Sequence, residues 1–362
     1  MIHTSLSIVG GGPAGLCAAI EASKRGVDSI LFERFDQLGG QLVKQTHKFF
    51  GSQRQYAGTR GFDIASKLER ELHESNQCQT KLNTTVVGMY PNHVLTVSGP
   101  EGYQKIQSEA IIVASGASER YLVFENNDLP GIYGAGAVQT LMNQYGVLPG
   151  KRVVMVGSGN IGLIVSYQLL QAGVDVACVI DAAPKIGGYL VHASKLRRRG
   201  VPIQTSRTIL RAEGKSQVER VITIGLDQAW RPIPGTEETL ECDLLCLAVG
   251  LSPLTQLLSM GGASMRQIQE LGGVVAVEGN EGQTTLEGIY VAGDAAGIEE
   301  ASSAMVEGRI AGIRAAMQLG HGLPDDNHTL QQLEEELQGL RRGPFGAKTR
   351  IGLDKLREEK HA

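Results

Sequence analysis

The sequence predicts an α/β fold with two Rossmann-like dinucleotide-binding domains, the second inserted into the first. Two observations carry this prediction. A short apolar run, a G-x-G-x-x-G turn and a helical pattern follow one another twice, with the turns at residues 10–15 and 157–162. In both copies the next apolar strand ends at an acidic residue, Glu33 in the first and Asp181 in the second. Two complete copies are far less expected by chance than one, so we expect two bound dinucleotides.

The composition is that of an ordinary globular protein. The chain has 362 residues, 42% of them hydrophobic, which is enough for the cores of two or three domains. The net charge is -4 and both signs are spread along the chain, so we expect no nucleic-acid and no membrane partner. The 47 glycines fit repeated tight turns. We also expect no secretory leader and no membrane span, because the chain opens on a strand and lacks a long apolar run.

Five cysteines are scattered along the chain, at Cys17, Cys78, Cys178, Cys242 and Cys246. Their odd number and irregular spacing argue against a disulfide framework and favour a reducing compartment, so the predicted location is the cytoplasm. The last two lie on a predicted buried strand, where we interpret them as structural thiols. We predict no metal site.

The first domain opens with the strand at residues 6–9 and its turn. Gly10 permits the tight turn, Gly12 lets the backbone approach a pyrophosphate, and Gly15 lets the helix of residues 16–25 pack on the strand. The phosphates are then expected at the helix N-terminus. Glu33, at the end of the strand at residues 29–32, is placed to accept a hydrogen bond from a ribose hydroxyl.

The turn at residues 39–42 is expected to return Gln41 towards the same pocket. The polar and aromatic stretch at residues 43–61, which includes Phe50, is either a surface excursion or a loop that contacts substrate or partner. A helix at 62–74 follows, with Ile64, Leu68 and Leu72 on one face. Strands are expected at 84–89, 93–98 and 110–114, and the last stops at Gly116, where backbone can pass close to a ligand. This part of the first domain spans residues 1–121.

The inserted domain is assigned to residues 122–253. It contains a short helix at 137–145, and then the second strand, turn and helix at 151–156, 157–162 and 163–172. The strand at 176–180 ends at Asp181. A helix at 190–199 and strands at 202–205, 218–226 and 243–249 complete it, the last stopping at Gly250. We interpret the basic residues between 195 and 199 as the solvated end of their helix.

The chain then returns to the first domain over residues 254–323. A strand at 288–292 leads to Gly293 and Asp294, and a helix at 299–319 carries many small residues, which suit close packing on a cofactor or on another backbone. Residues 324–362 are a charged C-terminal extension. We expect an exposed helix at 331–340 and a basic tail at 341–362, with partner contact and disorder both open for the tail.

With these motifs in this order, the chain resembles the two-dinucleotide-binding-domain flavoproteins, the pyridine nucleotide-disulfide oxidoreductase and thioredoxin reductase-like superfamily, over about residues 4–320. The resemblance implies that the first domain binds FAD and the second a nicotinamide dinucleotide. The implied FAD contacts are Gly10, Gly12, Pro13, Ala14, Gly15, Glu33, Gln41, Val86, Gly116, Gly293 and Asp294, with the backbone near Val86 meeting adenine and Asp294 holding the ribityl chain. The implied contacts of the second dinucleotide are Gly157, Gly159, Asn160, Ile161, Gly162, Asp181 and Gly250.

One departure from thioredoxin reductases bears on function. Their C-x-x-C pair is missing, because the matching residues 140–143 read Thr-Leu-Met-Asn. Disulfide reduction is therefore not expected. Residues 115–120, 129–137 and 299–302 look more similar to the NAD- and FAD-binding subunits of sarcosine oxidase, opine oxidase and hydroxyproline or proline dehydrogenase complexes.

This second resemblance implies a homo- or hetero-oligomer in which a separate flavoprotein subunit oxidises a small amine or amino acid. An iron-sulfur cluster would sit on a partner, since no cysteine follows Cys246.

Hydride transfer between nicotinamide and flavin needs no acid-base side chain, so we name no catalytic residue. Asp181 predicts NAD rather than NADP, because a carboxylate accepts from a free 2′-hydroxyl and repels a 2′-phosphate. Residues 182–184, Ala-Ala-Pro, add no basic side chain, although Lys185 follows. Two alternatives stay open. One is a stand-alone NAD(P)H reductase of ferredoxin, flavodoxin or a quinone, and the other is an FAD electron-relay subunit whose second site holds a structural adenine nucleotide.

Overall fold

A computed structural model describes residues 1–49, 53–278 and 283–357. The chain forms two compact units. Unit 1 comprises Met1–Ser118 and Leu251–Ala362, and unit 2 comprises Glu119–Gly250. The expected boundaries, after residues 121 and 253, lie slightly further along the chain, and the extension that we expected as a separate segment is part of unit 1.

The parallel strands of the unit 1 sheet end side by side at one edge of the sheet. Its strands run in the order β3-β2-β1-β6-β5-β4, and β19 also pairs with β6. The strands β3, β2, β1, β6 and β19 are parallel, and their register sets Val9 opposite Phe32 and Val113, and Val291 opposite Val113. The residues that follow these strands, Gly10 among them, therefore lie side by side. The strands are β1 (Ile2–Val9), β2 (Ser29–Phe32), β3 (Cys78–Lys81), β4 (Thr85–Tyr90), β5 (Val94–Gly99), β6 (Gly102–Val113) and β19 (Ile289–Val291).

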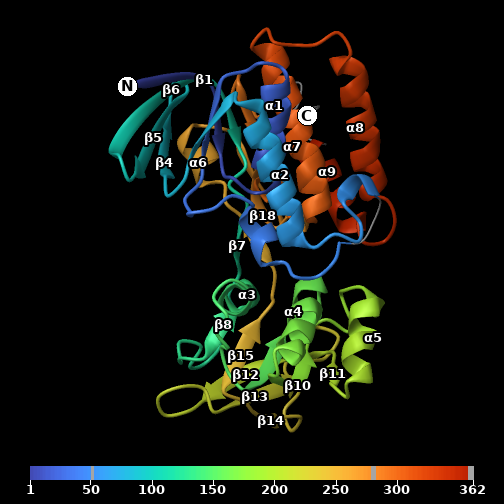
Figure 1. Ribbon diagram of the computed structural model, residues 1–362. Coiled ribbons are helices and arrows are strands. Elements are labelled where there is room, and N and C mark those ends of the chain that lie inside the picture. The colour runs from blue at the N-terminus through green and yellow to red at the C-terminus, as the bar shows by residue number, and fades with distance from the viewer. Residues whose placement is uncertain (50–52, 279–282, 358–362) are drawn as a thin grey trace. The chain divides into compact units, whose positions relative to one another are not determined.

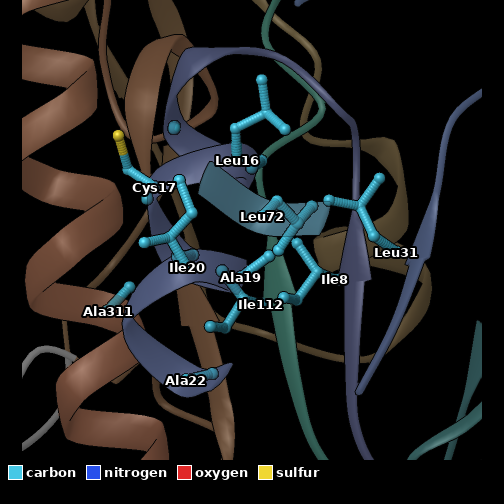
Figure 2. Packing of buried hydrophobic residues seen from close by; sticks show 14 of the residues in the cluster. Ile8, Leu16, Cys17, Ala19, Ile20, Ala22, Leu31, Leu72, Ile112 and Ala311 are labelled. Carbon is cyan, nitrogen blue, oxygen red and sulfur yellow. The ribbon is translucent and has the colours of Figure 1, made fainter. Parts of the chain in front are cut away.

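Three helices cover this sheet: α1 (Pro13–Lys24), α2 (Gly61–Ser75) and α7 (Ala301–Gln318). Figure 2 shows α1 between the sheet, with Ile8 and Ile112, and α7, with Ala311. A Cβ atom at Gly308 would lie 2.1 Å from the Ala14 carbonyl oxygen, and one at Gly312 would lie 2.4 Å from the Ala18 carbonyl oxygen. The small residues of α7 thus allow its backbone to approach that of α1. The apolar face predicted for α2 is confirmed, because Ile64, Leu68 and Leu72 are all buried.

The described part of the C-terminal extension, residues 324–357, contains two packed helices. It forms α8 (Asp326–Leu340) and α9 (Ala347–Arg357), and Figure 1 shows α8 alongside α7. Leu330, Leu333 and Leu337 are buried on α8 and pack against Val306, Ile310 and Ile313 of α7. The prediction of an exposed helix was therefore wrong for this face.

Disorder, one of the two possibilities left open for the tail, is also wrong for the residues of α9. Leu353 and Leu356 of α9 pack on Leu271 and on the hairpin of β17 (Met265–Ile268) and β18 (Gly273–Ala276). Leu271 lies in η3 (Gln269–Leu271) between these two strands.

Unit 2 repeats the parallel plan. Its main sheet has the order β11-β10-β9-β15-β8, and a three-stranded antiparallel sheet, β12-β13-β14, accompanies it. Val156 is opposite Ile180 and Leu247 in register, so Gly157, Asp181 and Ala248 come together at the carboxyl edge. The strands are β8 (Ile132–Gly134), β9 (Arg152–Val156), β10 (Asp175–Ile180), β11 (Ile203–Gln204), β12 (Arg207–Glu213), β13 (Arg220–Gly225), β14 (Glu238–Glu241) and β15 (Leu244–Leu247), and the helices are α3 (Ala135–Asn143), α4 (Asn160–Gln171) and α5 (Leu190–Arg198).

The chain passes between the units at β7 (Ala117–Glu119) and β16 (Leu251–Pro253), which pair with each other. The short helix α6 (Gln256–Met260) follows in unit 1. In the part of the chain that the structure describes, no helix has both the length and the apolar character needed to cross a membrane.

Candidate dinucleotide-binding sites

The three glycines of the first turn have different surroundings. A Cβ atom at Gly10, whose φ is 103°, would lie 2.3 Å from the Ala114 carbonyl oxygen, and one at Gly15 would lie 1.8 Å from the Gly10 carbonyl oxygen. Neither position can hold a side chain. At Gly12 the nearest such atom is the Cα of Gly40, 3.9 Å away. The outer glycines are therefore required by the protein's own backbone, whereas the middle one borders open space at the start of α1.

The turn of unit 2 has the same geometry. A Cβ atom at Gly157 would lie 2.3 Å from the Ala248 carbonyl oxygen, and one at Gly162 would lie 2.0 Å from the Gly157 carbonyl oxygen. A Cβ at Gly159 would meet nothing within 4 Å. Gly12 and Gly159 are the N-cap residues of α1 and α4, so no N-cap side chain occupies the space in front of either helix. This space, at the positive end of the helix dipole, suits a pyrophosphate.

Glu33 is fixed beside the first turn. Its Oε2 accepts a hydrogen bond from the Gly11 N–H at 2.8 Å, and its Oε1 accepts one from the Phe35 N–H at 2.9 Å. A carboxylate can accept about four hydrogen bonds, so capacity remains for a ribose hydroxyl. The Thr84 N–H donates to the Glu33 carbonyl at 2.8 Å, and β4, which carries Val86, therefore begins next to Glu33.

The segment after Glu33 folds back onto the turn. The Gly39 N–H donates to the Gly11 carbonyl at 2.8 Å, and a Cβ atom at Gly40 would lie 2.8 Å from the Cα of Gly12. Gln41 follows in the short helix η1 (Gly40–Lys44) and is exposed. The structure thus brings Gln41 close to the turn, with its side chain open to a ligand.

The ends of β6 and β19 complete the edge of unit 1. The Ala292 N–H donates to the Val113 carbonyl at 3.1 Å, so Gly293 lies beside the end of β6, where Gly116 follows three residues later. A Cβ atom at Gly293 would be 2.9 Å from the Cβ of Ala14, next to Pro13 at the start of α1. The glycines at the ends of three strands and the first turn of α1 therefore surround one region.

Asp294 is partly buried in the same region. Its Oδ1 accepts a hydrogen bond from the Glu299 N–H at 3.2 Å. Burial raises the pKa of Asp294 to about 6, and the charge of Glu299 acts in the same direction, while the backbone hydrogen bond opposes both. Asp294 can therefore change its protonation state in the mildly acidic range.

Sequence reasoning missed two residues behind this segment, Glu307 and Arg341. Glu307 Oε2 accepts a hydrogen bond from the Gly293 N–H at 2.8 Å, and Arg341 forms ion pairs with both Glu307 and Glu299. Burial raises the pKa of Glu307, Glu299 adds to this effect, and Arg341 opposes it. The available signal was a lone acidic residue in the otherwise small and apolar face of α7.

In unit 2, Asp181 is held by three hydrogen bonds. Its Oδ2 accepts from the N–H and the hydroxyl of Ser158, each at 2.6 Å, and its Oδ1 accepts from the Ala183 N–H at 2.8 Å. Arg207, the first residue of β12, donates to the Thr223 hydroxyl at 2.7 Å and to the Thr236 carbonyl at 3.1 Å. Its guanidinium is therefore directed into the antiparallel sheet.

A second loop, which the sequence did not single out, lies over the turn of unit 2. The Gly188 N–H donates to the Ser158 carbonyl at 2.9 Å, and the Tyr189 N–H donates to Asn160 Oδ1 at 2.8 Å. Ile161 is 41% exposed at the start of α4. Gly250, with a φ of 113°, lies in the segment between β15 and β16.

The described residues of the stretch 43–61 pack on the rest of unit 1. Phe49 and Tyr56 lie against its core, and Gln55 and Arg54 both contact Glu336 of α8. Phe50 lies outside the described residues. These contacts fit a loop that is anchored to its own unit, and they leave the choice between surface excursion and ligand contact open.

The cysteines are not arranged for redox chemistry. Cys17, Cys178, Cys242 and Cys246 are buried, as the structural interpretation of the last two requires. Burial raises the pKa of the Cys178 thiol to about 11 and that of the Cys242 thiol to about 12, and it also raises that of Cys246. These thiols are protonated at neutral pH. Among the described residues, no group of three or more His, Cys, Asp and Glu side chains is placed to hold a metal ion.

The chain is similar to several known proteins. The model of the family described as pyridine nucleotide-disulphide oxidoreductase matches residues 4–308. Hydrogen cyanide synthase subunit HcnB of Pseudomonas protegens is 30% identical over 86% of this chain and 70% of its own length, and an opine oxidase subunit from Agrobacterium tumefaciens is 29% identical over 87% and 65%. The crystal structure of L-proline dehydrogenase from P. horikoshii, at 23% identity, has the same fold with a TM-score of 0.73 over 93% of this chain and 59% of that one.

Proposed function

The chain belongs to the pyridine nucleotide-disulphide oxidoreductase family, and from this premise we propose that it is an FAD-dependent NAD(H) oxidoreductase that works without a redox disulfide. The resemblance predicted from the motifs is confirmed, and the chain is an oxidoreductase by family. Members of the family bind FAD and a pyridine nucleotide. The observation that carries the proposal is the pair of turns, one in each unit, in which the outer glycines are enclosed by backbone and the middle glycine is open.

We assign FAD to unit 1. In this assignment the Gly12 backbone and the N-terminus of α1 bind the pyrophosphate, Glu33 orients the ribose, and Asp294 accepts a hydrogen bond from the ribityl chain. The remaining proposed contacts are Gly10, Pro13, Ala14, Gly15, Gln41, Val86, Gly116 and Gly293. When bound, the flavin supplies the centre that gains or loses hydride, and the protein contributes binding, orientation and exclusion of water.

We assign NAD to unit 2, with contacts at Gly157, Gly159, Asn160, Ile161, Gly162, Asp181 and Gly250. Asp181 is oriented by Ser158 and Ala183 before any ligand binds. A fixed carboxylate accepts from a 2′-hydroxyl and repels a 2′-phosphate, while the guanidinium of Arg207 is engaged elsewhere. These features support NAD over NADP.

The electron route in this proposal avoids cysteine. Residues 140–143 of α3 contain none, and the buried thiols of unit 2 are protonated at neutral pH. Direct transfer between the two cofactors is then required, with the electrons passing on to a partner or a small acceptor.

We further propose that the chain is a subunit of an amine or amino-acid dehydrogenase or oxidase complex in the cytoplasm. Two relatives are named as subunits, of opine oxidase and of hydrogen cyanide synthase. The proposed partners are a flavoprotein and an iron-sulfur protein. Any iron-sulfur cluster would sit on a partner, because the described residues offer no metal-binding cluster. The five free thiols suit a reducing compartment.

One observation favours a second candidate, in which unit 2 keeps its nucleotide permanently bound. Five residues separate Asp181 from Gly187-Gly188, as five separate Glu33 from Gly39-Gly40, and both glycine pairs fold back onto their turn. The turn of unit 2 is thus contacted by a glycine pair in the same way as the turn of the site assigned to FAD. A structural adenine nucleotide in unit 2 would use the same residues.

An anaerobic titration of the FAD-loaded protein with NADH, and separately with NADPH, tests the main proposal. Loss of the flavin absorbance band at near-stoichiometric NADH is expected. A protein that retains FAD and is bleached by neither nucleotide would contradict NADH oxidation and favour the second candidate, which release of an adenine nucleotide on denaturation would identify. Bleaching without any co-purifying partner protein would favour a stand-alone reductase.

A further inference from the structure

Arg341, the residue that follows α8, lies between the carboxylates of Glu299 and Glu307. Its Nε is 2.9 Å and 3.1 Å from the two carboxylate oxygens of Glu299, and its Nη2 contacts both Glu299 and Glu307. The three side chains are largely shielded from water, with exposed fractions of 13% for Arg341, 10% for Glu299 and 16% for Glu307. A single guanidinium therefore offsets part of the negative charge of two nearly buried carboxylates and orients them.

Both residues bond to the segment that is assigned to the flavin, Glu307 through its carboxylate and Glu299 through its backbone N–H. Glu307 Oε2 accepts from the Gly293 N–H at 2.8 Å, and the Glu299 N–H donates to Asp294 Oδ1 at 3.2 Å. Gly293 and Asp294 are thus each one hydrogen bond away from a partner of Arg341. A displacement of the Glu307 carboxylate would act directly on Gly293, and a displacement of the Glu299 backbone would act directly on Asp294.

The position of Arg341 is itself fixed from several sides. Arg350 of α9 donates to the Arg341 carbonyl oxygen. At the other end of α8, Arg25 of α1 and Asp326 form an ion pair in which both side chains are almost fully buried. The extension is therefore anchored at both ends of α8. These contacts hold the Arg341 guanidinium beside Glu299 and Glu307.

We propose that Arg341 is a positioning residue for the flavin, which holds Glu299 and Glu307 so that Gly293 and Asp294 keep the geometry needed for the ribityl chain. The inference rests on the proposed FAD site of unit 1. It goes beyond the family resemblance, because Arg341 lies outside the matched residues 4–308. Removing the guanidinium leaves two nearly buried carboxylates close together without their counter-charge, an arrangement that is strongly unfavourable and is relieved when the side chains move or take up a proton.

The test compares FAD dissociation constants of purified full-length variants. Arg341→Met, which keeps much of the side-chain volume, is expected to weaken FAD binding about tenfold or more. Arg341→Lys keeps the charge but loses the planar guanidinium with its paired N–H donors, so it should weaken FAD binding less. The matched control is Arg314→Met, because Arg314 of α7 pairs with Glu334 of α8 at a more exposed place on the same helix pair. This control should bind FAD within about twofold of wild type.

A double-mutant cycle separates positioning from general stability. In the Glu307→Gln background, Arg341→Met should cost clearly less FAD affinity than in wild type, because the uncompensated acid has been removed. The visible circular dichroism of bound flavin should change in Arg341→Met and recover in the double variant, while thermal unfolding of the apo forms monitors the fold. If Arg341→Met does not fold, the same cycle is measured with Arg341→Lys in place of Arg341→Met, alone and in the Glu307→Gln background.

Three outcomes would overturn the proposal: wild-type FAD affinity in Arg341→Met, equal losses in Arg341→Met and Arg314→Met, or additive effects in the cycle. Failure of the FAD assignment itself looks different. In that case the wild-type protein binds no FAD, or Asp294→Ala leaves its affinity unchanged.

Discussion

At the scale of single residues, the proposed NAD site makes Asp181 the residue expected to discriminate between NADH and NADPH. Ser158 and Ala183 fix both oxygens of its carboxylate. Asp181→Ala is expected to raise the Michaelis constant for NADH about tenfold, since a charge-assisted hydrogen bond contributes about 1.5 to 3 kcal/mol. It should also reduce discrimination against NADPH, because the repulsion of the 2′-phosphate is removed.

Steady-state kinetics with NADH and NADPH measure both effects. Asp175→Ala is the matched control, because Asp175 begins β10, the strand that ends just before Asp181, and forms an exposed ion pair with Arg152. An unchanged ratio of the two specificity constants in Asp181→Ala would remove Asp181 from the site.

Asp294 gives the proposed FAD site a predicted pH dependence. Burial raises the pKa of this carboxyl to about 6, so the folded apoprotein binds its proton more tightly than the unfolded chain does, and this group makes the apoprotein less stable as pH rises from about 4 to 6. A ribityl hydroxyl that donates to the carboxylate favours the ionised form. FAD affinity should therefore fall as pH is lowered through about 6.

Fluorescence titration of FAD between pH 5 and 8, in wild type and in Asp294→Asn, measures this dependence, with the pH values chosen to bracket the raised pKa of about 6. The neutral amide should give weaker binding throughout with a flatter profile. Parallel profiles in the two proteins would show that another group titrates.

The residues that could be predicted are those whose role follows from short-range spacing. Gly10, Gly12 and Gly15 occur within a single turn, and Glu33 ends the next strand, so the sequence pattern alone placed them together. Glu307 and Arg341 could not be found in this way. Their pairing depends on how α8 packs against α7, which no local pattern specifies.

At the scale of elements, the contact between α1 and α7 depends on glycine. A Cβ atom at Gly308 would lie 2.1 Å from the Ala14 carbonyl oxygen, so Gly308→Ala forces the two helices apart. We expect the substitution to lower the free energy of unfolding by about 1 to 3 kcal/mol, as overpacking in a rigid core does. It should also weaken FAD binding, because Ala14 belongs to the first turn of α1.

Denaturant unfolding of the apoprotein checks this prediction. Gly339→Ala in α8 is the control, since a Cβ there meets nothing within 4 Å and the higher helix propensity of alanine should leave stability unchanged or raise it by up to about 1 kcal/mol. If both variants had the stability of wild type, the close approach of α1 and α7 would be contradicted.

Helices with a clear apolar period could be predicted closely from the sequence, as α2 illustrates. The packing of the C-terminal extension on unit 1 could not. The leucines at 330, 333 and 337 have the spacing of a buried face, yet the segment around them is rich in charge, and we interpreted it as exposed. Short strands such as β12 and β14 were missed from the sequence. Each is stabilised by its pairing with β13, and its own composition does not indicate a strand.

At the scale of the whole molecule, the two units have separate cores. Leu16, Ile64 and their neighbours form the core of unit 1 around α1, and Val153, Leu163 and their neighbours form that of unit 2 around α4. None of the buried hydrophobic clusters among the described residues draws members from both units. Each nucleotide should therefore stabilise the unit that binds it.

Hydrogen exchange followed by mass spectrometry tests this expectation peptide by peptide. Added to the apoprotein, FAD should slow exchange at residues 10–16, 33–42 and 293–300, and NADH at residues 157–163 and 181–190, because a ligand lowers the population of opened forms of its own site. At a ligand concentration about 100 times the dissociation constant, the stabilisation of the binding unit approaches about 2.7 kcal/mol. Asp294→Ala should reduce the FAD effect alone, and Asp181→Ala the NADH effect alone. Protection of unit 1 by NADH in the absence of FAD would place the nicotinamide nucleotide in the wrong unit and contradict the assignment of the two sites.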